Sequence, residues 1–253
     1  CHPSVYSLPH SAHHVGPLTV QRPFYPEGET CHLYLLHPPG GVVGGDTLDI
    51  SVRLDAKSHT LITMPGASKF YRSSGPQARL SQHFYLDEGS TLEWLPQDTI
   101  IFPGANAALR SVFHLKASST LLAWELYCLG RPVIGETFSH GTLESRLEVW
   151  VDDEPRLIER QHLGDGDLTP VAGHPWIGTL LFYPANEEHL DTVRALLAPL
   201  GHFAGATLTD ELLSVRFLSH DNLICQRVMR DIWQSLRPLL TTKTACSPRI
   251  WQT

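Results

Sequence analysis

Apolar and polar residues alternate along several segments of the chain, in the pattern of half-buried β-strands. This period of two is seen at 48–54, 80–86 and 109–115 and again at 143–151, and a further strand is expected at 156–163. Each of the first three segments leads through a short polar turn into a more uniformly apolar one, at 61–64, 92–95 and 121–129. Because these apolar segments lack alternation, we expect both of their faces to be covered.

The three polar turns are similar to one another. Each runs between two leucines, Leu54 to Leu61, Leu86 to Leu92 and Leu115 to Leu121, and the first turn contains one extra residue. The second leucine therefore recurs about every 30 positions. A repeat of that length, built from pairs of strands, predicts stacked β layers or a coarse β-helix.

The pattern changes after residue 164, where two helices are expected. Asn186 can cap a helix over 187–200, and a strand at 211–218 precedes a second helix that begins at Asp221 or Asn222. We expect this second helix to end near Pro238 and to bury a stripe of Ile224, Val228, Ile232 and Leu236. The predicted fold class is thus mainly β, an elongated β-helix-like stack of strands with two α-helices in the C-terminal third.

We interpret the chain as a single domain over residues 1–253. Within it, residues 1–15 form a ragged N-terminal segment, residues 16–163 the stacked β body, and residues 164–253 a mixed α/β part packed on that body.

Composition and charge narrow the possible functions. The 253 residues carry 26 acidic and 19 basic side chains, a net charge of −7, which argues against a nucleic-acid partner. No segment approaches the roughly 20 apolar residues of a membrane span. The five cysteines are scattered without a Cys-x-x-Cys pair, which argues against a disulfide scaffold and a zinc ribbon and favours the reducing cytoplasm. Cys128 and Cys225 lie in apolar runs and are expected in the core.

A glycine-rich stretch, HPPGGVVGGDT at 37–47, is the most unusual local feature. It is not a phosphate-binding loop, because the Gly-Lys-Ser/Thr ending is absent and a strand follows where a helix would be needed. We interpret it as a turn in which Val42 and Val43 are buried, with Asp46 as the one residue open to function.

Four motifs carry a resemblance to a known family: HPPGGVVGGD (37–46), MPGASKFYRS (64–73), LEWLPQDTI (92–100) and CLGRPVIGE (128–136). In this order they resemble the UreD/UreH family of urease accessory proteins, in particular its enterobacterial-type members, over residues 16–251. The resemblance implies a layered β fold with two helices. It also implies a protein that is not an enzyme but binds the urease apoprotein and, with the F-type accessory protein and the nickel-carrying G-type GTPase, enables nickel insertion into urease.

Several carboxylates stand inside apolar strands, notably Glu93, Glu125 and Glu159. A buried carboxylate must be paired or solvated, because an isolated buried charge costs several kcal/mol. One interpretation is a set of structural ion pairs, with these available cations: Lys69, Arg72, Arg131 and Arg160.

The other interpretation is a polar passage through the stacked layers, lined by Asp46, Ser68, Glu125 and Glu159. Oxygen ligands in a row could hold a divalent ion weakly enough to release it. We therefore expect no permanent cofactor, but transient nickel at Asp46, Glu125 and Glu159.

The remaining candidates are structural or partner-contact residues: Lys69, Tyr71, Arg72, Glu93, Trp94, Arg131 and Glu136. An alternative to the scaffold is a β-helix-type hydrolase or lyase that uses Lys69, Tyr71 or Arg72 with a carboxylate, and a cleft converging on these residues would favour it. A metal-storing module is a third possibility. Exposed apolar patches would favour the scaffold, since surfaces that bind partners are left bare in the isolated chain.

Overall fold

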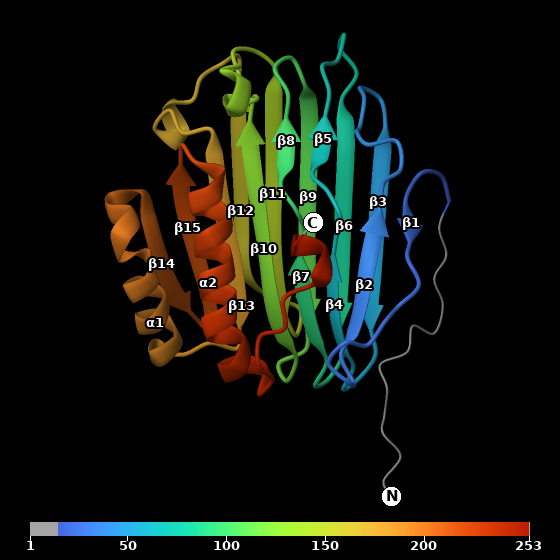
Figure 1. The fold of residues 1–253 in the computed structure, drawn as a ribbon, viewed down its shortest axis with the longest axis vertical. Helices are drawn as coiled ribbons and strands as arrows, with labels where there is room; N and C mark the ends of the chain where they lie inside the picture. The colour runs from blue at the N-terminus through green and yellow to red at the C-terminus, as the bar shows by residue number, and fades with distance from the viewer. Residues whose placement is uncertain (1–14, 253) are drawn as a thin grey trace, which may run out of the picture.

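A computed structural model describes residues 15–252 of the protein, in which two β-sheets face each other and two helices cover the larger sheet (Figure 1). The larger sheet contains β1 (Thr19–Val20), β2 (Cys31–Leu36), β4 (His59–Thr63), β5 (Ser68–Phe70), β7 (Thr91–Leu95), β8 (Thr99–Ile101), β10 (Thr120–Leu129), β13 (Trp176–Tyr183), β14 (Ala204–Thr209) and β15 (Leu212–Ser219). The smaller sheet contains β3 (Thr47–Leu54), β6 (Ala78–Leu86), β9 (Asn106–Leu115), β11 (Thr142–Val151) and β12 (Glu154–Gly164). The helices are α1 (Glu187–Leu197) and α2 (Asn222–Thr241), with short 3-10 helices η1 (Pro132–Ile134), η2 (Thr169–Val171), η3 (Ala198–Phe203) and η4 (Arg249–Gln252).

The centre of the molecule is a β-solenoid of about three turns. Strands β4, β7 and β10 run parallel in the larger sheet, and β3, β6, β9 and β11 run parallel in the smaller one. The chain alternates between the two sheets, so that each turn adds one strand to both. The prediction of a mainly β, β-helix-like fold with two C-terminal helices is confirmed.

The predicted alignment of the three polar turns is correct at the first leucine of each turn. At the second leucine it is wrong by one residue for the first turn. Leu54, Leu86 and Leu115 are neighbours in the smaller sheet, as expected. In the larger sheet, however, Leu92 pairs with Thr60, and Leu61 pairs with Glu93. The first turn therefore has the same length as the other two, and the extra residue assigned to it, Thr60, belongs to the buried strand β4.

Two hydrophobic cores lie on opposite faces of the larger sheet, which explains why its strands are apolar throughout. Along β10, Leu121 and Ala123 face the smaller sheet, whereas Leu122 and Trp124 face the helices. Between the sheets, Phe84 of β6 stacks on Phe113 at 4.7 Å between ring centroids and lies 4.8 Å from the ring of Trp94 on β7. The expectation that both faces of these strands are covered is confirmed.

Strand β13 continues the larger sheet antiparallel to β10 and is followed in space by β15 and β14. Helices α1 and α2 pack over this part of the sheet (Figure 1). The cysteines Cys128 and Cys225 are buried in the core beneath them, as predicted. Among residues 15–252, no helix is long and apolar enough to cross a bilayer.

The helix starts are where the caps predict them, but α2 differs in its face and its end. Asn186 accepts a hydrogen bond from the His189 amide and caps α1, and Asp221 caps α2. The buried side of α2 carries Cys225, Met229, Ile232, Trp233, Leu236 and Arg237.

Two sequence expectations for α2 are therefore wrong. Ile224 is exposed, because the helix turns its Trp233 side toward the sheet. The helix also continues one turn beyond the expected end and includes Pro238. The predicted ragged segment at 1–15 lies outside the described residues, apart from Val15.

Candidate functional site

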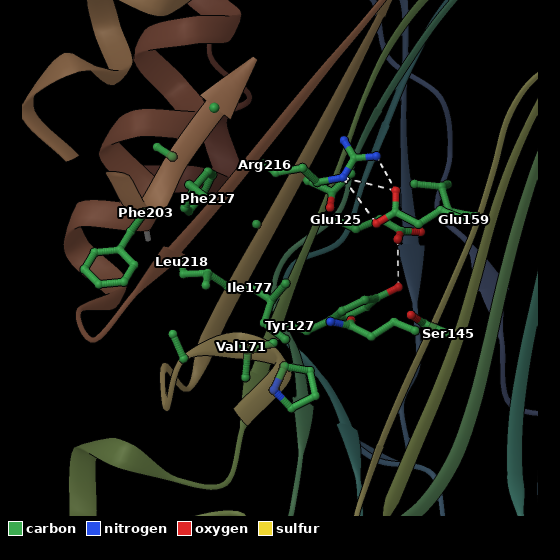
Figure 2. Close-up of a pocket in the computed structure, with 18 of the residues that line it drawn as sticks. Glu125, Tyr127, Ser145, Glu159, Val171, Ile177, Phe203, Arg216, Phe217 and Leu218 are labelled. Carbon is green, nitrogen blue, oxygen red and sulfur yellow. Dashed lines mark hydrogen bonds and ion pairs between the residues drawn. The ribbon is translucent and has the colours of Figure 1, made fainter. Parts of the chain in front are cut away.

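A cavity of about 590 Å³ lies between the two sheets where β10, β13 and β15 face β11 and β12 (Figure 2). Its walls include the carboxylates of Glu125 and Glu159, the Tyr127 phenol and the Arg216 guanidinium. Of the four residues predicted to line a polar passage, the structure brings Glu125 and Glu159 together.

Glu125 points into the space between the sheets because it occupies an inward position of β10. Tyr127, two residues further along the same face, donates its hydroxyl to Glu125 Oε2 at 2.7 Å. Ser111 on the inner face of β9 donates its hydroxyl to Oε1. Burial raises the pKa of Glu125, and the negative charge of Glu159 adds to this effect, while the hydrogen bonds from Ser111 and Tyr127 oppose it.

Glu159 binds Arg216 in a two-pronged ion pair. Arg216 Nε lies 3.3 Å from Glu159 Oε1 and 3.1 Å from Oε2, and a terminal guanidinium nitrogen also donates to Oε2. Glu159 belongs to β12 and Arg216 to β15, so this pair joins the smaller sheet to the larger one across the cavity (Figure 2). Arg216 is not among the cations named from the sequence as available partners, and one of those, Arg160, points to the opposite face of the same strand.

The cavity offers carboxylate oxygens, which suit hard divalent cations, whereas imidazole is the donor that suits nickel. Among the described residues, no group of three or more His, Cys, Asp and Glu side chains is placed to hold a metal ion. A cation that entered would meet two carboxylates, would compete with Arg216 for Glu159, and would displace any proton held by Glu125.

Asp46 and Ser68 do not line this cavity. Asp46 is exposed, and its Oδ2 accepts a hydrogen bond from the Val43 amide at 3.0 Å, so its carboxylate closes the glycine-rich turn. Ser68 begins β5 and directs its hydroxyl to the Met64 sulfur at 3.9 Å. The structure therefore brings two of the four residues together at this cavity and places Asp46 and Ser68 elsewhere. Val43 was also expected to be buried, but it is 49% exposed.

The side chains proposed for an enzyme have packing roles. The Tyr71 ring packs edge-on against Phe102, with 4.9 Å between centroids, and covers Gly41, where an added Cβ would lie 2.1 Å from a ring carbon. Lys69 accepts a hydrogen bond from Val42 through its backbone. Neither Lys69, Tyr71 nor Arg72 lines the inter-sheet cavity.

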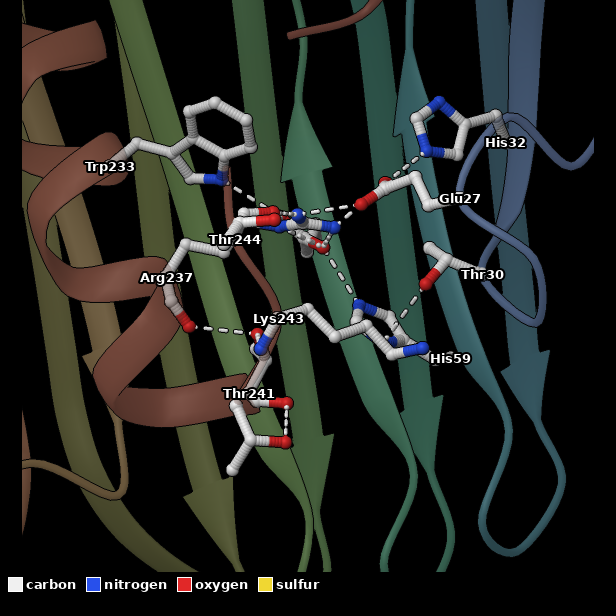
Figure 3. A network of polar contacts seen from close by, with 11 residues as sticks. Glu27, Thr30, His32, His59, Trp233, Arg237, Thr241, Lys243 and Thr244 are labelled. Atoms are coloured by element: carbon white, nitrogen blue, oxygen red, sulfur yellow. Dashed lines mark hydrogen bonds and ion pairs between the residues drawn. The ribbon is translucent and has the colours of Figure 1, made fainter. Parts of the chain in front are cut away.

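Glu93 is fully buried and belongs to a second polar cluster, centred on Arg237 of α2. Figure 3 shows this cluster around Arg237, between the larger sheet and α2. Arg237 Nε lies 3.0 Å from both oxygens of Glu93, and its terminal nitrogens lie 2.8 Å from the Glu27 carboxylate. His59 at 2.7 Å and Trp233 at 2.8 Å complete the contacts of Glu93. Hence Arg237 bridges two carboxylates in the interior.

The general expectation of paired buried carboxylates holds, but the predicted partners do not. Burial alone would raise the pKa of Glu93, yet the hydrogen bond from His59 and the charge of Arg237 outweigh it and lower the pKa. None of the cations named from the sequence contacts Glu93: Lys69, Arg72, Arg131 and Arg160. The neighbouring Trp94 is a core residue that is 1% exposed.

Glu27 gives this cluster a defined pH dependence. Burial would raise its pKa, but hydrogen bonds from His32 and Arg237 and the charge of Arg237 lower it to about 2. A lowered pKa contributes stability that is complete above the ordinary value of 4.5 and is lost as the pH falls toward 2. We therefore expect the difference in unfolding free energy between the native chain and Glu27→Gln to shrink between pH 4.5 and 2.5 in urea titrations. A difference that stays constant over this range would contradict the assignment.

Arg131 and Glu136 pair with each other at the base of a projecting loop that contains η1. The tip of this loop is apolar and bare: Val133 is 90% exposed and Ile134 is 65% exposed. A bare apolar tip held by an ion pair at its base is typical of a surface that meets another protein.

Sequence reasoning missed the groups that hold the two glutamates of the cavity. Ser111 and Gln82 occupy equivalent inward positions of neighbouring strands, and Gln82 Nε2 lies 3.4 Å from Ser111 Oγ. Both interrupt an otherwise apolar alternation, and this signal was available in the sequence. Arg216 had no such signal, because it alternates with apolar residues as a surface arginine would.

Comparison of the sequence with known proteins identifies the family. The family model described as UreD urease accessory protein matches residues 5–252. Urease accessory protein UreD of Enterobacter sp. (strain 638) is 76% identical over 253 residues, which are 100% of this chain and 92% of the relative. UreD of Klebsiella aerogenes is 71% identical over 243 residues (96% and 90%), and UreD of Pseudomonas putida (strain GB-1) is 55% identical over 240 residues (95% and 87%). The chain therefore belongs to the UreD family of urease accessory proteins.

Proposed function

We propose that this protein is a non-catalytic scaffold that binds the urease apoprotein and, together with the F-type and G-type accessory proteins, enables nickel insertion into the urease active site. The link to urease is supported by its relatives, which are named urease accessory proteins. The single observation that carries the nickel part of the proposal is the inter-sheet cavity, where Glu125 and Glu159 face the same space.

Nickel is the cargo in this proposal and not a resident cofactor. Glu125 must be ionised to bind the cation, and because burial raises its pKa, any proton that it holds would leave as the cation arrives. Arg216 would hold Glu159 in place before and after passage. Two oxygen donors bind a divalent ion weakly enough to let it leave, whereas a complete set of ligands would trap it.

The scaffold part of the proposal is supported by the apolar loop tip of Val133 and Ile134. The hydrolase or lyase alternative gains no comparable support, since none of Lys69, Tyr71 and Arg72 lines the cavity, and the Tyr71 and Arg72 side chains pack over Gly41 and Gly104 instead. The proposed setting is the cytoplasm, where urease and its partner proteins would be met.

The test is urease activation in a bacterial host that expresses the urease operon. We expect Glu125→Gln and Glu159→Gln to remain in the complex in a pull-down. Nickel per urease active site, and with it urease activity, should fall by roughly tenfold, the scale typical when a group that supports metal binding is removed. Glu187→Gln, a change of the same chemistry on exposed helix α1, is the matched control and should behave as the native chain.

Two outcomes would contradict the proposal at different points. Unchanged nickel content in both variants would mean that the cavity carboxylates are structural. A native chain that binds neither the urease apoprotein nor the F-type protein would reject the scaffold itself.

A further inference from the structure

The outer face of the smaller sheet carries a row of arginines in register. Arg110 on β9 is paired with Arg146 on β11, which is paired with Arg160 on β12. Arg79 on β6 lies in the adjacent row, next to Ala108 on β9, which is in turn paired with Glu144 on β11. Like charges directly opposite one another on neighbouring strands destabilise a sheet. This arrangement therefore needs compensating negative charge.

The compensation inside the chain is incomplete. Glu148 serves two arginines, at 2.9 Å from an Arg110 nitrogen and 2.7 Å from Arg146 Nε. Glu144 is near Gln77 and His162 instead.

That distribution leaves two arginines without a carboxylate. Within residues 15–252, no carboxylate lies within ion-pairing distance of Arg79 or Arg160, and both are exposed. Arg79 Nε is held by the Gln77 amide oxygen at 3.1 Å, which orients the guanidinium without neutralising it. Two cations on one sheet face, of which Arg79 is held in a fixed orientation, are therefore open to an external anion.

The four arginines line a groove of about 560 Å³ on this face, here called the arginine groove (Arg79, Arg110, Arg146 and Arg160). It crosses four neighbouring strands, a width of roughly 14 Å at the usual strand spacing, which an extended segment of about four residues would span. Planar guanidinium groups bind carboxylates with two parallel hydrogen bonds, so a row of arginines suits a row of carboxylates.

The net negative charge of the chain favours a short anionic ligand over a long one. With a net charge of −7, the protein repels a long polyanion that extends beyond the groove. A short acidic segment is affected far less, because charges beyond about 8 Å are screened at physiological ionic strength.

We propose that the arginine groove is a docking site for a short acidic segment, rich in Glu or Asp, of a partner protein. The site is on the opposite face of the smaller sheet from the inter-sheet cavity, so docking and the chemistry of that cavity are separable. Carboxylates of the segment would pair with Arg79 and Arg160, the two arginines of the groove that Glu148 does not neutralise.

The test is fluorescence anisotropy with the full chain and a fluorescein-labelled hexaglutamate peptide. We expect binding that weakens with added salt and that is absent for hexaglutamine. Removing two exposed ion pairs in Arg79→Gln/Arg160→Gln should weaken binding by roughly tenfold. Arg160→Gln alone should give an intermediate loss, roughly threefold. The control Arg194→Gln/Arg227→Gln removes the same charge from exposed positions of the helices and should change binding less than about twofold.

Three results would overturn this inference. Equal losses in both double variants would show a response to net charge alone. Displacement of the peptide by equimolar inorganic phosphate would show a site for small anions. Tighter binding of a single-stranded oligonucleotide than of hexaglutamate would identify a nucleic-acid surface instead.

Discussion

Replacing Glu93 by alanine is expected to lower the free energy of unfolding by about 3–5 kcal/mol, the usual effect of breaking a buried ion pair from one side. The variant would leave the fully buried Arg237 with Glu27 as its remaining carboxylate. It would also remove the acceptors of the Trp233 indole and the His59 ring. Urea denaturation at neutral pH measures the change.

The control for Glu93→Ala is Glu187→Ala, which removes an exposed carboxylate from the first turn of α1 and should cost at most about 1 kcal/mol. Glu93→Gln should fall between the two, because it keeps the shape and some hydrogen bonds but removes the charge. A loss below about 1 kcal/mol for Glu93→Ala would show that the cluster adds little net stability, as replacement studies of some buried ion pairs have found.

Replacing Phe84 by alanine is expected to cost a similar amount, about 3–5 kcal/mol, through a different mechanism. Phe84 is fully buried and its ring contacts both Phe113 and Trp94, so it fills space where the two sheets of the solenoid meet. The alanine variant would lose this contact with the larger sheet and leave a cavity. Thermal or urea unfolding gives the measurement.

Two variants bracket the Phe84 result. Phe84→Leu keeps most of the volume and should cost less than about 1.5 kcal/mol. Ile158→Ala removes an apolar side chain that is 49% exposed on the same sheet and should cost within about 0.5 kcal/mol. If Phe84→Ala were no worse than Ile158→Ala, the contact between the sheets would not limit stability.

Much of the fold could be predicted because it follows from local sequence patterns, namely the alternation of polar and apolar residues and the repeated turns. The alternation of Leu80, Gln82 and Phe84 places a strand and its inner face, and the similar turns align each solenoid layer with the next in the smaller sheet. The one-residue error at Leu61 arose because leucine was matched to leucine, whereas the structure pairs Thr60 with Leu92. In a buried strand, threonine can occupy a core-facing register when its hydroxyl is satisfied, so residue type alone does not fix register.

The candidate site was only half predictable for a related reason. Glu125 and Glu159 were identifiable as carboxylates inside strands, but their partners depend on contacts between the two sheets that no local pattern encodes. Arg216 reaches Glu159 from 57 residues away. The burial of Arg237 has a local signal, because it follows Trp233 by one helical turn and therefore lies on the helix face that packs into the core.

The pairing of Glu93 with Arg237 also bears on how the chain is made. These residues are 144 positions apart, and at typical synthesis rates of about 5–20 residues per second roughly 10–30 s separate their emergence. During that interval β7 carries a carboxylate with no arginine to receive it, on a sheet face that α2 has yet to cover. The solenoid layers can stack as they leave the ribosome, but this face can close only when α2 arrives, so a late helix completes the burial of strands made much earlier.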